Sequence, residues 1–121
     1  MAPAHAGLMK NKLIASLTVV LALGATSALA ATAGENWDTH CAKCHGPDGK
    51  AQTKLGTKLK LKDYSNPASL AKFTDADLAK ATAQGVKDNG KEKMKGFSDK
   101  LSPDEITALV KQIRGFAAPA K

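Results

Sequence analysis

The clearest periodic pattern in this chain lies near its C-terminus. Apolar side chains recur there at helical spacing, at Ile106, Leu109, Val110 and Ile113. This spacing places them on one face of a helix. The preceding segment, Ser102–Glu105, has the form of a capping box with proline at the first helical position. The pattern predicts an amphipathic helix that begins after Ser102 and ends at Arg114 and Gly115.

Three shorter helical segments are expected earlier in the chain, over residues 34–45, 66–73 and 74–85. Asn66 and Thr74 have side chains that accept hydrogen bonds from the first turn of a helix, so each suits the start of its segment. Glycine at the end of the third segment is typical of a helix terminus.

The remaining segments lack clear periodicity. Residues 50–62 are rich in lysine, with Leu55, Leu59 and Leu61 as apolar contacts, and are expected to form a loop. Residues 86–97 are also expected to form a loop, and one of that length in a small domain is typically functional or disordered. No segment alternates like a strand, so the sequence carries no sheet signal.

One short stretch carries the chemistry of the chain, Cys41-Ala42-Lys43-Cys44-His45. Two cysteines two residues apart, followed directly by histidine, form the attachment signature of a c-type haem. The thiols lie about one helical turn apart, so both can add to the two vinyl groups on one edge of a porphyrin. We therefore predict one haem c, held covalently through thioethers from Cys41 and Cys44, with His45 as the proximal iron ligand.

Two other uses of this motif are disfavoured. A thioredoxin-type cysteine pair has the same spacing but no use for the histidine, and a structural zinc site needs a fourth ligand. After residue 30 the chain has no second cysteine pair and only one other histidine, His40.

Met94 is the residue expected to bind the iron from the other side. It is the only methionine outside the N-terminal region, and it lies among lysines in residues 86–97. Methionines often fill gaps in cores, but binding to haem iron would explain why this one turns inward from a polar segment. His40 is a weaker candidate, because the tethered helix keeps it from the face opposite His45, and it is otherwise expected at the surface. A lysine of the loop could replace Met94 at high pH, once deprotonated.

The N-terminal region has the pattern of a secretory signal peptide. Lys10 and Lys12 precede an apolar run, residues 13–23, that is too short to be a comfortable membrane span. Small residues at positions 28 and 30 match the pattern that signal peptidase reads, so cleavage is expected after residue 30, with residue 33 as an alternative. An uncleaved N-terminal anchor is the competing interpretation, and Met9 is an alternative start.

Cleavage would leave residues 31–121, enough for one domain and not two. This domain has 16 basic and 11 acidic residues, a formal charge of +5 before the haem propionates are counted. A basic balance is compatible with binding to nucleic acid or anionic lipid. In an exported haem protein, an acidic patch on a redox partner is the favoured interpretation. We expect no nucleic acid, no stable membrane insertion after cleavage, and a monomer.

Together these features resemble the small bacterial class I cytochromes c. The chain matches them in the haem motif followed by Gly46, in Trp37 one turn before the first cysteine, in Met94 in a late loop, and in the closing amphipathic helix. The resemblance covers essentially all of residues 31–121, which would form the cytochrome c domain.

The resemblance implies an all-α class I cytochrome c fold. In that fold the N- and C-terminal helices cross, and shorter helices and loops wrap one covalent haem. The crossing would bring Trp37 against Leu109 and Val110, with Ala33 or Gly34 permitting a close approach.

The chain departs from the family pattern at two places. Many relatives have proline directly after the ligand methionine, whereas this chain has Lys95 and Gly96. Many also have a proline whose carbonyl orients the haem histidine, but no proline lies between Pro47 and Pro67. A more mobile loop and a weaker iron–sulfur bond would follow.

Axial binding by histidine and methionine leaves no open iron position for a substrate. We therefore expect a soluble periplasmic carrier of single electrons without enzymatic activity of its own; a thylakoid lumen is the less favoured compartment. The alternatives are a haem subunit of a larger oxidoreductase and a peroxidase-like or gas-binding protein with a displaceable sixth ligand.

The expected partners are redox proteins with acidic docking patches, such as a dehydrogenase, a cytochrome complex, an oxidase or a reductase. Lysines would steer the encounter if they flank the exposed haem edge. The candidates are Lys43, Lys50, Lys91, Lys93 and Lys95. An ordinary solvated lysine face is the alternative interpretation.

Overall fold

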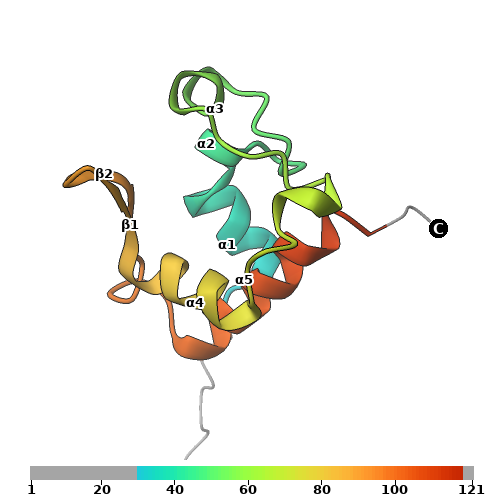
Figure 1. Ribbon diagram of the computed structural model, residues 1–121. Coiled ribbons are helices and arrows are strands. Elements are labelled where there is room, and N and C mark those ends of the chain that lie inside the picture. The colour runs from blue at the N-terminus through green and yellow to red at the C-terminus, as the bar shows by residue number, and fades with distance from the viewer. Residues whose placement is uncertain (1–29, 119–121) are drawn as a thin grey trace, which may run out of the picture.

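The computed structural model describes residues 30–118, and its secondary structure is mainly helical. Its elements in chain order are α1 (Ala33–His40), α2 (Ala42–His45), α3 (Lys54–Leu59), the 3₁₀ helix η1 (Pro67–Ser69), α4 (Asp75–Gln84), β1 (Gly85–Asp88), β2 (Lys91–Lys95) and α5 (Pro103–Gly115) (Figure 1). Apart from its last residue, the expected signal peptide lies outside the described residues. No helix within residues 30–118 has the length and apolar character needed to cross a membrane.

Helices α1 and α5 pack against each other at the centre of the fold (Figure 1). Trp37 and Leu109 share the main core cluster and are only 2% and 1% exposed. Val110 is also buried but lies outside that cluster. The Asn36 side-chain amide donates to Glu105 Oε2 at 2.8 Å and ties the two helices together. The predicted pairing of the terminal helices is confirmed.

Gly34 does not provide the close approach expected of it. A Cβ atom at this position would meet only Thr32 Oγ1, at 3.9 Å, which is an ordinary contact. The core of the crossing is therefore made by the large side chains Trp37 and Leu109.

Capping residues set the starts of the two later helices as the sequence predicted. Helix α5 begins with a complete capping box between Ser102 and Glu105, and the four apolar residues of its predicted face are all buried. Helix α4 has the same arrangement between Thr74 and Asp77, and it gives way at Gly85. Each box satisfies backbone N–H groups that the first turn of a helix leaves free.

The other helical predictions need correction. The first helix is interrupted at Cys41, so the motif forms a separate short helix, α2. The segment after Asn66 forms one 3₁₀ turn and does not remain helical to Phe73. Residues 50–62 are not all loop, because Thr53 accepts from Gly56 N and starts α3.

The expectation that residues 86–97 form a loop was wrong, whereas the expected helical fold class is confirmed. Strands β1 and β2 form an antiparallel hairpin over most of the segment that was expected to be a loop. Asn89 and Gly90, at its turn, have positive φ angles of 51° and 77°, as a tight hairpin turn with the twist of its strands requires. The sequence did not indicate these strands because both of their faces are largely polar and exposed, so apolar and polar residues do not alternate along them.

The side chain of Arg114 holds the segment before α4 against the end of α5. Its Nε donates to Asp75 Oδ1 at 2.8 Å, and its Nη1 and Nη2 donate to the carbonyls of Leu70 and Phe73 at 3.2 and 2.6 Å. One guanidinium thus satisfies three acceptors and positions a segment that forms one wall of the cavity described below.

Candidate functional site

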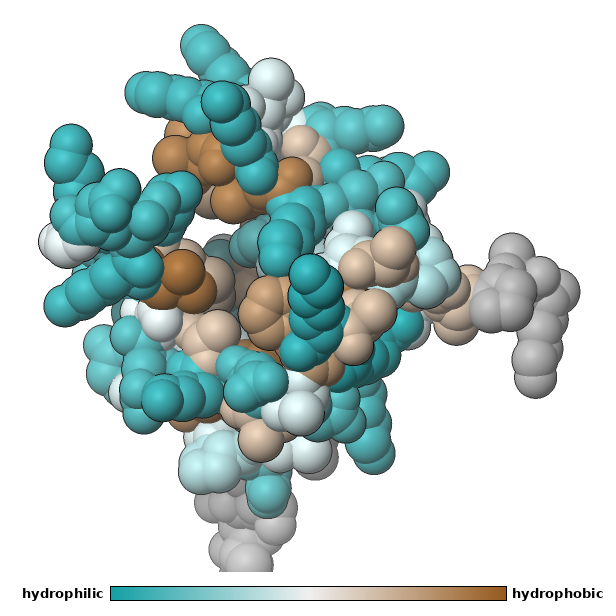
Figure 2. Space-filling model, viewed as in Figure 1, coloured by the Kyte–Doolittle hydropathy of each residue, from teal (hydrophilic) through white to brown (hydrophobic). Residues whose placement is uncertain are grey.

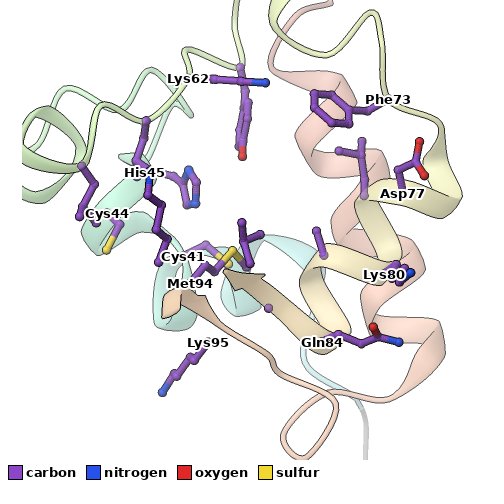
Figure 3. A pocket seen from close by; sticks show the side chains of 18 of the residues that line it. Cys41, Cys44, His45, Lys62, Phe73, Asp77, Lys80, Gln84, Met94 and Lys95 are labelled. Carbon is purple, nitrogen blue, oxygen red and sulfur yellow. The ribbon is translucent and has the colours of Figure 1, made fainter. Parts of the chain in front are cut away.

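A cavity of about 970 Å³ lies among α2, α4, the hairpin and the segment from Leu59 to Phe73. All four predicted site residues line it: Cys41, Cys44, His45 and Met94 (Figure 3). Its volume lies near the upper end of the range for small-molecule and cofactor sites. Leucines, phenylalanines and a valine from several elements contribute apolar lining. In Figure 2, hydrophobic residues lie around a hollow in the surface that is bordered by hydrophilic ones.

Cys41 lies between α1 and α2 and is the N-cap of α2, and Cys44 lies within α2. The N–H groups of Cys44 and His45 both donate to the Cys41 carbonyl, at 3.2 and 3.0 Å. Cys41 is buried, Cys44 is half-buried, and both are free thiols. Burial, and then the proximity of Cys44, raise the pKa of the Cys41 thiol to about 11, so this thiol is protonated at neutral pH.

His45 is half-buried at the end of α2 and points into the cavity (Figure 3). Burial lowers the pKa of its imidazole, which favours the neutral form that binds metals. The Tyr64 ring is stacked on it, with centroids 5.1 Å apart, and the Trp37 ring lies 5.7 Å away. Its Nδ1 atom is buried and has no hydrogen-bond partner in the described part of the chain.

Met94 lies on β2, half-buried, and its side chain also points into the cavity (Figure 3). It pairs with Val86 on β1, and the next pair is Lys87 with Glu92, so Lys93 is an extra residue in β2. Such a bulge kinks a strand and changes the direction of its side chains. The sequence singled out Met94, and the structure brings it to the same cavity as His45.

His40 lies elsewhere on the cavity wall and is not the surface residue expected. It is half-buried, and its ring lies 5.4 Å from that of Phe97. It is the last residue of α1, whereas His45 is the last residue of α2.

Seven lysines line the cavity, and only two of them, Lys93 and Lys95, were expected there. The seven are Lys60, Lys62, Lys72, Lys80, Lys87, Lys93 and Lys95. Lys43, Lys50 and Lys91 are not part of the lining, and Asp77 is its single acidic residue. Sequence reasoning missed five of the seven because they come from separate elements, and no local pattern shows that the fold brings them together.

The metal-binding side chains of this cavity can hold a metal only if other ligands complete its coordination. Residues 30–118 contain no group of three or more histidine, cysteine, aspartate or glutamate side chains that could hold an ion. One imidazole and one thioether can supply at most two ligands. An apolar cavity with two free thiols beside it fits a flat, apolar metal complex such as haem, attached through those thiols.

Comparisons with known proteins agree with this chemistry. Residues 28–113 match the family described as cytochrome c oxidase, cbb3-type, subunit III. A solved structure described as the KustC0563 c-type cytochrome is 32% identical, with a TM-score of 0.64, and the match covers 73% of this chain and 100% of that one. A tyrosine-to-phenylalanine mutant of it is also 32% identical, with a TM-score of 0.62, and the match covers 71% and 99% of the two chains. A search of curated proteins found no match.

Proposed function

This chain belongs to the c-type cytochrome family described as cytochrome c oxidase, cbb3-type, subunit III, whose members are haem electron-transfer proteins, and we propose that it is a soluble periplasmic carrier with one haem. The observation that carries the proposal is that Cys41, Cys44, His45 and Met94 all line one cavity. The family implies covalently bound haem c. With two cysteines in the chain, one haem bound by two thioethers is the simplest stoichiometry.

The bound haem would supply reversible one-electron chemistry at iron, and the chain would tune it. His45 from α2 and Met94 from β2 would bind the iron. Burial lowers the pKa of the His45 imidazole, which favours the neutral form whose lone pair could bind iron. The surrounding apolar side chains would limit access of water, which disfavours the more highly charged oxidised state of the site.

If His45 and Met94 both bind the iron, no position would remain for a substrate. We therefore infer that the protein is not an enzyme. Periplasmic location is inferred from the N-terminal pattern of residues 10–30. Because both cysteines would be attached to the haem, the lack of a disulfide does not argue against this location.

An optical spectrum of the holoprotein, matured in a bacterial periplasm, tests this proposal. We expect low-spin spectra in both redox states, a ferric methionine–iron charge-transfer band, and no change when carbon monoxide is added to the reduced protein. Met94→Ala should remove the band and allow carbon monoxide to bind. A high-spin wild-type spectrum, or ready binding of carbon monoxide, would refute the carrier and favour a gas-binding or peroxidase-like protein.

The lysines that line the cavity support an acidic redox partner. A cluster of one charge sign around a cofactor steers association, and salt screens it. We expect Lys62→Glu and Lys72→Glu to slow electron transfer with an acidic partner about tenfold at low ionic strength, and less at high salt. Lys111→Glu is the matched control, because Lys111 is an exposed lysine of α5 outside the cavity. An equal effect of all three substitutions would point to net charge alone.

A second candidate follows from the family description, which refers to an oxidase subunit. The same haem chemistry would then serve a permanent complex. The two candidates differ in assembly, so the holoprotein should be isolated from its own membranes and periplasm by affinity capture. Recovery as a free monomer supports the carrier, and recovery in fixed proportion with an oxidase supports the subunit.

A further inference from the structure

The imidazole of His45 contacts two other rings. The Tyr64 ring lies nearly parallel to it, with the planes inclined by 20° and the centroids 5.1 Å apart. The Trp37 ring is tilted by 43° at 5.7 Å. Trp37 is itself fixed, because it is 2% exposed and its Nε1 donates to the Gly46 carbonyl at 2.9 Å. The orientation of the imidazole is therefore restricted by aromatic surfaces.

No hydrogen bond fixes this imidazole within residues 30–118, where its buried Nδ1 is unpartnered. Two carbonyl groups close to it in sequence accept hydrogen bonds from other donors. The Cys44 carbonyl accepts from Thr53 Oγ1 at 2.6 Å, and the His45 carbonyl accepts from Ala51 N at 2.8 Å. Metal-binding histidines in proteins almost always donate their second ring N–H to an acceptor, which fixes the ring plane.

We propose that stacking on Tyr64, and not a hydrogen bond at Nδ1, sets the plane of the His45 imidazole at the iron. The inference rests on the proposed function, because it takes His45 as an iron ligand. It makes Tyr64 a positioning residue that acts through its ring and not through its hydroxyl.

The turn that carries Tyr64 is held on both sides. The N–H of Tyr64 donates to the Gly49 carbonyl at 2.8 Å, so this turn is attached to the loop that follows the haem motif. The Asp63 carboxylate accepts from both the N–H and the hydroxyl of Ser65, at 2.8 and 2.5 Å. These hydrogen bonds fix the backbone of the turn that presents the Tyr64 ring to the imidazole.

This arrangement has a consequence for the iron. A hydrogen bond from Nδ1 makes an imidazole a stronger electron donor, which favours oxidised iron. An imidazole held by stacking alone is a weaker donor, so the reduction potential shifts in the positive direction. Many relatives orient the haem histidine through the carbonyl of a proline that this chain lacks between Pro47 and Pro67. Stacking on Tyr64 would take the place of that hydrogen bond.

Two substitutions separate the ring of Tyr64 from its hydroxyl. Tyr64→Phe keeps the stack, and Tyr64→Leu removes it while leaving an apolar side chain. In oxidised low-spin haem, the order and spread of the four ring-methyl proton resonances depend on the planes of the axial ligands, so NMR reports the His45 plane. We expect Tyr64→Phe to keep the wild-type pattern and Tyr64→Leu to change the order of the resonances or compress their spread.

Phe116→Leu is the matched control, because Phe116 lies outside the cavity lining and packs on Trp37, with ring centroids 4.8 Å apart. It should leave the order of the resonances unchanged. An effect of Tyr64→Phe as large as that of Tyr64→Leu would assign the role to the hydroxyl. An unchanged pattern in Tyr64→Leu would show that the stack does not set the plane. Either result overturns the proposal.

A measurement on the wild-type protein keeps the inference testable if Tyr64→Leu does not mature. In reduced holoprotein labelled with ¹⁵N and ¹³C, we expect no scalar coupling between His45 Nδ1 and any carbonyl carbon. A detected coupling would reveal a hydrogen bond and overturn the proposal. Failure of the proposed function would be distinct, because the wild-type spectrum itself would then be high-spin.

Discussion

On the His45 side of the cavity, the candidate ligand is attached to the most buried part of the molecule. Trp37, which contacts the imidazole, packs with Leu109 at the crossing of α1 and α5. On the Met94 side, the candidate ligand lies on a hairpin whose strands are mostly exposed. Phe97 N donates to the Thr82 carbonyl at 2.9 Å and ties the base of that hairpin to α4.

This difference suggests that the two ligands would be held with unequal strength. Displacing His45 means disturbing the central core, which costs a large part of the stability of a small domain. Displacing Met94 requires only movement of a hairpin with few buried contacts, and such elements open locally at low cost. Changes on the His45 side should therefore destabilise the whole domain, whereas changes on the Met94 side should leave the fold intact.

The largest effect is expected from Trp37→Ala. Loss of a fully buried tryptophan costs about 3–5 kcal/mol, and this substitution also removes the bond from Nε1 to the Gly46 carbonyl. Val86→Ala on the hairpin is the matched change, because Val86 is 39% exposed, and it should cost less than about 1 kcal/mol. Chemical denaturation of the two holoproteins measures both values. Similar losses would mean that the two sides contribute equally to stability.

A smaller effect, confined to the hairpin, is expected from Gly96→Ala. A Cβ at this position would meet the Ala83 carbonyl oxygen at 2.5 Å, so the backbone must move. We expect a cost of about 1–3 kcal/mol, with loss of the methionine–iron band and new binding of carbon monoxide.

Gly90→Ala, at the tip of the hairpin, is the control for this change. A Cβ there meets nothing within 4 Å, but its φ of +77° strains any other residue, at about 1 kcal/mol. The spectrum should therefore survive in Gly90→Ala. Retention of the band in Gly96→Ala would show that the hairpin base does not position Met94.

A pH-dependent effect is expected at the contact between α1 and α5. The hydrogen bond from the Asn36 amide, followed by that from the Ser102 backbone, lowers the pKa of the Glu105 carboxyl. Because the folded state has the lower pKa, the stabilisation is present above the ordinary pKa of glutamate and is lost as the pH falls through the folded value.

Glu105→Gln should therefore be less stable than the wild type at neutral pH, with the difference shrinking as the pH falls below the ordinary pKa of glutamate. Asp104→Asn removes a charge from the same turn but leaves the bond to Asn36. Denaturation curves across pH 3–7 compare the variants. A constant difference between Glu105→Gln and the wild type would argue against a contribution from this carboxylate.

The smallest effect is expected from the ion pair within the hairpin. Lys93 Nζ lies 2.8 Å from Asp88 Oδ2, and both side chains are about half exposed. Exposed pairs contribute from 0 to about 1 kcal/mol and are screened by salt, so Asp88→Asn should hardly change the unfolding midpoint. Thermal unfolding at low and high salt checks this. A loss well above 1 kcal/mol would mean that the hairpin is more tightly held than its exposure indicates.

The sequence predicted the parts of this molecule that depend on local patterns. Helix α5 follows from its capping box and apolar spacing. The spacing of Cys41, Cys44 and His45 predicted that they lie about one helical turn apart, but not that the helix is interrupted at Cys41. Met94 could be singled out because an isolated methionine in a polar segment needs a reason to turn inward.

The rest depends on contacts between distant segments. The hairpin was missed although Asn89-Gly90 is a strong turn signal, because its strands lack an apolar face. The stacking of Tyr64 on His45 joins residues 19 positions apart and leaves no periodic trace in the sequence. The lysines of the cavity likewise come together only when the chain folds.

The central claim is that Met94 binds the haem iron opposite His45. If the signal region is removed as predicted, Met94 is the only methionine left, so holoprotein with ¹³C-labelled methionine methyl groups gives a single NMR signal. In the reduced protein, a methyl group bound above the haem should resonate far upfield because of the ring current of the porphyrin. A signal at the position of a free methionine would contradict the claim and leave His45 as the only protein ligand identified.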